Sequence, residues 1–205
     1  MIIHGRRRMA GGLAVAVLAG SLHLTAFTAA AQHMSYRGTL HDRAMDPKYN
    51  RDLNPKYNRS LNPDYNRQIN PGYNRDLDPR YNRSLNPEFT RSLNPRYERL
   101  LNPVRNTPLN PIRNKGINPL RSAWTGYYVF DLEARLTGLA AEAGGREVLN
   151  LFDPAGMWTG FAVQAGEQGY NLFDMDAAWS GYLRPDGGGG YNLFGLEGTW
   201  RGYLR

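Results

Sequence analysis

From residue 46 the chain places one aromatic and one aliphatic residue among polar ones in a strict period of eight. Tyr49 and Leu53 begin this pattern, and their spacing of four resembles a helical stripe. Proline stands at the second position of each copy, and a proline every eight residues forbids a continuous α-helix. The unit is N-P-x-Y-N-R-x-L, with copies starting at 46, 54, 62, 70, 78, 86, 94, 102, 110 and 118. Asn-Pro suits the start of a type I turn, so each copy is predicted to be a turn followed by a short extended piece.

Two arrangements of the array at 46–121 are compatible with this pattern. In a narrow β-solenoid, Tyr and Leu lie inside, Asn and Arg lie outside, and identical side chains form ladders roughly 4.8 Å apart. In an extended, largely disordered stalk, two large apolar residues per copy bury too little surface to offset the ordering entropy. The regular placement of Tyr and Leu favours order, whereas the sparse apolar content favours disorder.

The last three copies differ from the others. Their third position is apolar and their fourth is arginine instead of an aromatic residue: Val104, Ile112 and Leu120, then Arg105, Arg113 and Arg121. End repeats of an array are usually atypical, so these copies are interpreted as a terminal cap or a docking seam, or alternatively as drift of a tolerant repeat.

A second repeat, with a period of 21 residues, fills the segment 122–205. Copies open at Asn150, Asn171 and Asn192 with the letters N-L-F, and a weaker copy lies at Tyr128. Each copy is typical of two short strands around a turn, and the copies are linked by glycine-rich turns. Strands spaced by about ten residues predict an antiparallel meander, either open or curled towards a barrel. The fold class is therefore an all-β repeat protein, with the octapeptide array followed by β-hairpins.

The alternation within one copy also predicts which side chains share a face of the sheet. Phe173, Trp179 and Leu183 are expected on one face, and Leu172 and Tyr182 on the other.

The phrase L-F-G-L-E-G-T-W-R-G-Y-L at 193–204 resembles the MORN repeat, in which an aromatic strand, a turn ending in glycine and a second aromatic residue before glycine follow one another. The resemblance covers only the last 80 or so residues. It implies a meander of hairpins and a role as a scaffold or as a module that contacts lipid or protein. It implies no catalytic residue.

Residues 1–31 are predicted to be a secretory signal peptide. Arginines at 6–8 precede a mostly apolar stretch, and three alanines at 29–31 offer the small residues that a signal peptidase reads. Cleavage is expected before Gln32, and residues 32–45 are expected to be a linker. An uncleaved membrane anchor is the alternative, but polar residues interrupt the apolar run. The prediction is a secreted or periplasmic protein without a transmembrane segment after cleavage.

Charge is distributed unevenly around the net +7. Residues 46–121 contain fifteen basic and seven acidic residues (+8), whereas residues 122–205 contain five basic and ten acidic residues (−5). The chain has no cysteine, which excludes disulfides, thiol catalysis and Cys-ligated metals. Beyond the predicted cleavage site only His33 and His41 remain, which disfavours a histidine-based triad or metal site.

Three further groups of residues were weighed as candidate sites. Asp is a favoured turn residue, so turn formation is the preferred role for the aspartates at 131, 153 and 174 over catalysis or metal binding. Regular spacing favours a core role over sugar stacking for the tryptophans at 124, 158, 179 and 200. The run Gly187–Gly190 lacks the G-K-[ST] of a phosphate loop. No catalytic residue, cofactor or metal is therefore expected.

These observations predict an exported, non-catalytic repeat protein that acts as a scaffold or surface-binding module at a bacterial envelope. The alternative is a protein that binds a polyanion or glycan through its rows of Arg and Tyr, and an enzyme in the hairpin segment is disfavoured. A row of arginines that survives mutual repulsion suits an external anionic polymer or envelope surface. The candidate residues, all at the sixth position of a copy, are Arg51, Arg59, Arg67, Arg75, Arg83, Arg91 and Arg99.

Overall fold

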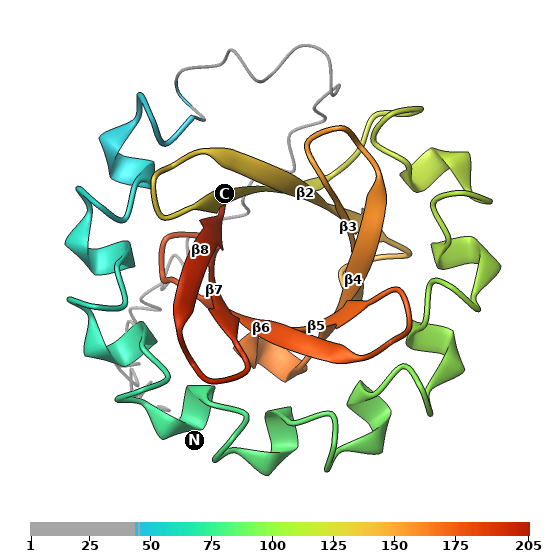
Figure 1. Ribbon diagram of the computed structural model, residues 1–205, viewed down its shortest axis with the longest axis horizontal. Helices are drawn as coiled ribbons and strands as arrows, with labels where there is room; N and C mark the ends of the chain where they lie inside the picture. The colour runs from blue at the N-terminus through green and yellow to red at the C-terminus, as the bar shows by residue number, and fades with distance from the viewer. Residues whose placement is uncertain (1–43, 45) are drawn as a thin grey trace, which may run out of the picture.

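The computed structural model describes residue 44 and residues 46–205. Its architecture is a β-barrel enclosed by a ring of short helical turns (Figure 1). The predicted signal peptide, its cleavage site before Gln32, and the two candidate histidines at 33 and 41 lie outside the described residues. Among the residues that are described, no helix is both long and apolar enough to cross a membrane.

The hairpin repeats form a closed antiparallel barrel in which each strand pairs with the next in sequence and β1 pairs with β8. A single 3-10 turn, η10 (Gly166–Gln168), links the fourth and fifth strands within the described chain. The predicted all-β meander is confirmed, in its closed form. The strands are β1 (Gly126–Asp131), β2 (Leu136–Ala143), β3 (Val148–Phe152), β4 (Trp158–Gln164), β5 (Tyr170–Asp174), β6 (Trp179–Pro185), β7 (Tyr191–Gly195) and β8 (Trp200–Leu204).

The predicted face assignment is wrong because each hairpin contains a β-bulge. Phe173 pairs with Trp179 but Leu172 pairs with Gly181, so Ser180 is an extra residue in β6. One extra residue reverses the inside–outside alternation beyond it. Leu172 and Leu183 therefore share the barrel interior, while Phe173, Trp179 and Tyr182 lie on the outer surface.

The octapeptides form a belt, here defined as residues 46–122, that curves around the outside of the barrel (Figure 1). Each copy is a Pro-x-Tyr turn followed by a 3-10 turn, so both the predicted β-solenoid and the predicted disordered stalk are wrong. The 3-10 turns are η1 (Arg51–Leu53), η2 (Arg59–Leu61), η3 (Arg67–Ile69), η4 (Arg75–Leu77), η5 (Arg83–Leu85), η6 (Arg91–Leu93), η7 (Arg99–Leu101), η8 (Thr107–Leu109) and η9 (Lys115–Ile117).

Two asparagine side chains per copy replace the backbone ladders that a solenoid would have used. The Asn62 carboxamide accepts from the Asp64 N–H (2.8 Å) and donates to the Pro55 carbonyl of the preceding copy (3.0 Å). Asn66 likewise accepts from the Gln68 N–H (3.1 Å) and donates to Ser60 O (2.7 Å). Both ends of each amide are therefore used, one to cap its own turn and one to hold the previous copy.

The belt turns its leucines towards the barrel and its tyrosines away from it. Leu61 and Leu85 are only 5% and 4% exposed, whereas Tyr65 is 64% exposed. The expectation that Tyr and Leu share an interior is wrong, because the barrel supplies the apolar surface that an eight-residue coil lacks. Leu109 packs against Val163 and Phe173 on the outer face of the barrel.

Buried side chains of the barrel donate hydrogen bonds to the carbonyl of the last residue of a copy. The Nδ2 atoms of Asn150, Asn171 and Asn192 donate to Leu109, Leu85 and Leu61 at 2.8–3.1 Å. These asparagines are 21 residues apart, whereas their acceptors are 24 residues apart, which is three copies of the octapeptide. Arg184 and Arg205 repeat the relation with Leu77 and Leu53 (2.6 and 2.9 Å). One hairpin is therefore matched to three octapeptides.

Candidate functional site

The outer surface of the belt carries a row of stacked arginine and aromatic side chains. In each case the guanidinium lies over the ring six residues later, in the next copy, with 4.7–5.0 Å between the guanidinium carbon and the ring centroid. The rings remain 52–64% exposed. The stacked pairs are Arg51–Tyr57, Arg59–Tyr65, Arg67–Tyr73, Arg75–Tyr81, Arg83–Phe89 and Arg91–Tyr97.

This arrangement accounts for how like-charged arginines are tolerated. A guanidinium over an aromatic face is attracted by the ring quadrupole, and stacking leaves the N–H edge of the guanidinium accessible. Within residues 46–205, no ion pair joins any of the seven predicted arginines to a carboxylate. Arg99 lacks a ring partner because Arg105 replaces the aromatic residue of the next copy.

The atypical end of the belt contacts the barrel at one residue of the predicted seam. A Cβ on Gly156 would lie 2.5 Å from Leu120 Cδ2, so this leucine sits directly on the turn between β3 and β4. Val104 and Ile112 are 38% and 70% exposed. Only Leu120 of the three apolar substitutions therefore acts as a docking residue.

Two buried arginines join the barrel to the belt, and no sequence motif pointed to them. Arg205 forms a buried ion pair with Asp186, and both side chains are almost completely buried. Arg184 is fully buried without a carboxylate within ion-pair distance. Burial lowers the pKa of Arg184 to about 10. The 21-residue spacing of these two arginines was the signal available in the sequence.

The aspartates at 131, 153 and 174 serve the hairpin turns. Asp131 accepts from the N–H groups of Glu133 and Arg135 (3.0 and 2.8 Å), and Asp174 accepts from those of Asp176 and Ala178 (2.9 and 2.8 Å). Asp153 accepts from Met157 N–H (2.8 Å). No group of three or more His, Cys, Asp or Glu residues in the described chain is arranged to hold a metal.

The tryptophans pack between the belt and the barrel. Trp124 is buried, and the other three are half-buried against the apolar clusters on the outer barrel surface. The indole N–H of Trp158 donates to Gly160 O (2.7 Å), and that of Trp179 donates to Gly181 O (2.8 Å). Their aromatic faces are therefore part of the core, in agreement with the preferred prediction.

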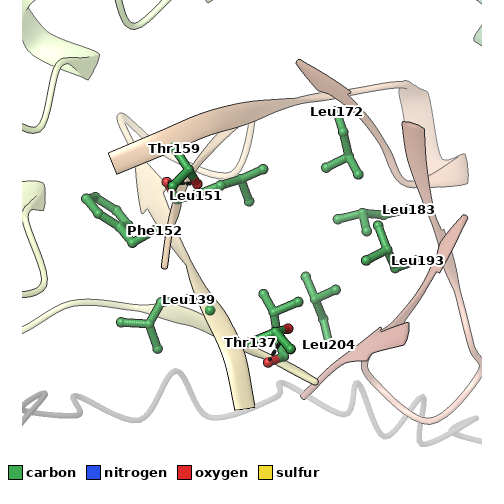
Figure 2. Close-up of a pocket in the computed structure, with 11 residues that line it drawn as sticks. Thr137, Leu139, Leu151, Phe152, Thr159, Leu172, Leu183, Leu193 and Leu204 are labelled. Carbon is green, nitrogen blue, oxygen red and sulfur yellow. Dashed lines mark hydrogen bonds between the residues drawn. The ribbon is translucent and has the colours of Figure 1, made fainter. Parts of the chain in front are cut away.

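The barrel interior contains a cavity of about 170 Å³ at the end formed by the four hairpin turns. Figure 2 shows Leu172, Leu183, Leu193 and Leu204 pointing into this space. Val129, Leu151 and Leu193 are half-buried, so solvent reaches the lining. Thr137 and Thr159 add hydroxyl groups, which donate to Val129 O and Leu151 O (both 3.2 Å).

The opposite end of the barrel is filled by three tyrosines. Tyr191 meets Tyr127 and Tyr170 edge to face, with ring centroids 5.3 and 5.4 Å apart. The Tyr170 hydroxyl donates to Arg146 O (2.8 Å). Burial raises the pKa of all three phenols, to about 12 for Tyr170. The interior is thus blocked by aromatic rings at one end and hollow at the other.

The fold and surface define a class: a closed eight-stranded antiparallel barrel held inside a belt of asparagine-capped 3-10 turns. No family model, curated protein or solved structure matches the chain. The likeness to the MORN repeat remains a resemblance of one phrase.

Proposed function

We propose that this protein is an exported, non-catalytic binding scaffold whose belt binds an anionic polysaccharide at the cell envelope. Export rests on the predicted signal peptide. The observation that carries the proposal is the row of six exposed arginine–aromatic stacks, repeated in phase around the belt.

The chemistry of the row suits a sulfated or carboxylated sugar polymer. Each arginine can donate a pair of N–H groups to a carboxylate or sulfate, and the exposed ring beside it offers a flat apolar face to a sugar. The belt carries a net charge of +8, whereas the segment 122–205 carries −5. Charge complementarity therefore directs an anionic polymer to the belt.

The test is binding of the chain that begins at Gln32 to heparin at several salt concentrations. The logarithm of the binding constant is expected to fall linearly with the logarithm of salt concentration, because each arginine contact releases a counterion. The triple substitution R67Q/R75Q/R83Q is expected to weaken binding and to reduce this slope.

A matched control removes the same charge from the barrel. Arg135, Arg146 and Arg201 are exposed, with side-chain exposures of 73%, 67% and 54%. R135Q/R146Q/R201Q is expected to leave the slope unchanged. Equal losses from both triple variants would contradict a site on the belt, and stronger binding to single-stranded DNA than to heparin would point to nucleic acid.

A further inference from the structure

The barrel interior is left partly empty because four of its inward positions are glycine. Gly138, Gly160, Gly181 and Gly202 recur at matched places on β2, β4, β6 and β8. A Cβ on Gly138 would lie 2.4 Å from Phe152 O on the neighbouring strand, and the other three meet similar carbonyls at 2.3–2.6 Å. The close approach of the strands thus requires glycine, and no side chain fills the layer between Val129, Leu151 and Leu193.

Apolar side chains make up the rest of the lining. Leu172 and Leu193 stand near the turns, and Leu183 and Leu204 lie deeper (Figure 2). An engineered apolar cavity of about 150 Å³ stays dry and binds benzene. The present cavity, at about 170 Å³, has room for a hydrocarbon of similar size.

The turns around this end of the barrel carry an excess of carboxylates. The segments 131–135, 153–157, 174–178 and 195–199 contain six acidic residues and one basic residue, Arg135. Two further arginines lie against Glu197: Arg201 pairs with its carboxylate (2.7 Å), and Arg80 donates to its carbonyl. Counting all three arginines, the end remains at −3, which disfavours an anionic head group and favours a cationic one.

We propose that the turn end of the barrel binds a small cationic amphiphile, with its alkyl chain among the leucines and its ammonium group among the turn carboxylates. This site is separate from the belt, which is basic and would repel such a ligand. It therefore stands or falls independently of polysaccharide binding.

The probe is hexyltrimethylammonium, compared with hexanol and hexanoate by isothermal titration calorimetry on the chain that begins at Gln32. One equivalent of hexyltrimethylammonium is expected to bind more tightly than hexanol, and hexanoate more weakly. The gap between the cationic and anionic ligands is expected to close as salt is raised, because the carboxylates are exposed.

Filling the cavity tests its location. Leu193→Phe is expected to weaken hexyltrimethylammonium binding by at least about tenfold, and Leu100→Phe, an exposed belt position, is expected to leave it unchanged. Leu193→Ala enlarges the same space and is expected to improve binding of octyltrimethylammonium over the hexyl homologue, which keeps the test valid if the Phe variant does not fold. Binding that is insensitive to both Leu193 variants, or hexanoate binding as tightly as hexyltrimethylammonium at low salt, would overturn the proposal.

Discussion

The belt and the barrel are both built from repeats, yet they satisfy their backbones and place their aromatic residues in opposite ways. The barrel uses strand ladders and buries Phe161, Phe173 and Tyr182. The belt caps isolated turns with asparagine side chains and exposes its tyrosines. Each belt copy has one leucine to bury and no core of its own, while the barrel has an apolar outer face that needs a cover. The comparison teaches that neither repeat forms a complete core without the other.

The ratio of the two periods follows from this concentric arrangement. Three octapeptides, 24 residues, accompany each 21-residue hairpin, because the belt follows a longer path around the same axis (Figure 1). The belt also runs in the opposite direction, since Asn150, Asn171 and Asn192 meet Leu109, Leu85 and Leu61 in reverse order.

Separating the two regions should have the largest effect. We expect residues 122–205 alone to lose cooperative unfolding and to aggregate, because the outer faces of Phe173 and Val163 become exposed. We expect residues 46–121 alone to lose their turn structure, since their leucines have nothing to pack against. Denaturant melts and circular dichroism on the fragments and on their mixture measure both effects. A cooperative transition of the isolated barrel segment would contradict this mutual dependence.

Equivalent truncations of an aromatic residue in the two regions should differ sharply. Phe173→Ala removes a side chain that is 1% exposed and should cost about 3–5 kcal/mol. Tyr73→Ala removes one that is 63% exposed and should change the free energy of unfolding by less than about 0.5 kcal/mol. Urea melts of the full chain compare them, and equal costs would place the belt tyrosines in a core.

The buried ion pair between the regions should be far more sensitive than an exposed one. Asp186→Asn leaves the Arg205 guanidinium buried without its counter-charge and should cost about 3 kcal/mol or more. Glu197→Gln breaks the Arg201 pair, in which both side chains are 54% exposed, and should cost less than about 1 kcal/mol. The double variant D186N/R205M should recover much of the loss in chemical denaturation, and no recovery would show that the turn bonds of Asp186 to Gly188 and Gly190 carry its effect.

The smallest effect concerns alkaline pH. Burial raises the pKa of Tyr170 to about 12 from an ordinary value of 10.0. The folded state therefore holds this proton more tightly, so its contribution is fully present below pH 10 and is lost as pH rises towards about 12. Tyr170→Phe should lose less stability over this window than the unmodified chain, measured by urea melts at each pH.

Tyr65→Phe, at an exposed belt position, is the matched control and should follow the unmodified chain. The depressed pKa of Arg184 acts with the opposite sign in the same window, because losing its proton relieves a buried charge. Arg184 is present in every variant compared, so it cancels. Identical pH profiles for the two tyrosine variants would contradict a role for the buried phenol.

Local features of both regions could be predicted from the sequence. Proline at every eighth residue excluded an α-helix, Asn-Pro indicated a turn in each copy, and the 21-residue period indicated hairpins with aspartate in the turns. The seven candidate arginines were recognised from their phase alone, and six of them stack on aromatic rings. The cavity and the buried arginines were missed, since glycine and arginine in a strand give no sign of which way the strand faces.

The amino-acid sequence by itself determined the two periods, the turn in every octapeptide and the antiparallel strands, because these depend on the φ angle of proline, on asparagine capping and on alternation over a few residues. Only the tertiary structure decided that β1 pairs with β8, that leucine faces inwards while tyrosine faces solvent, and that Leu183 lies inside the barrel. These choices depend on one bulge residue per hairpin and on an apolar surface supplied by a distant part of the chain, and neither leaves a periodic signal in the sequence.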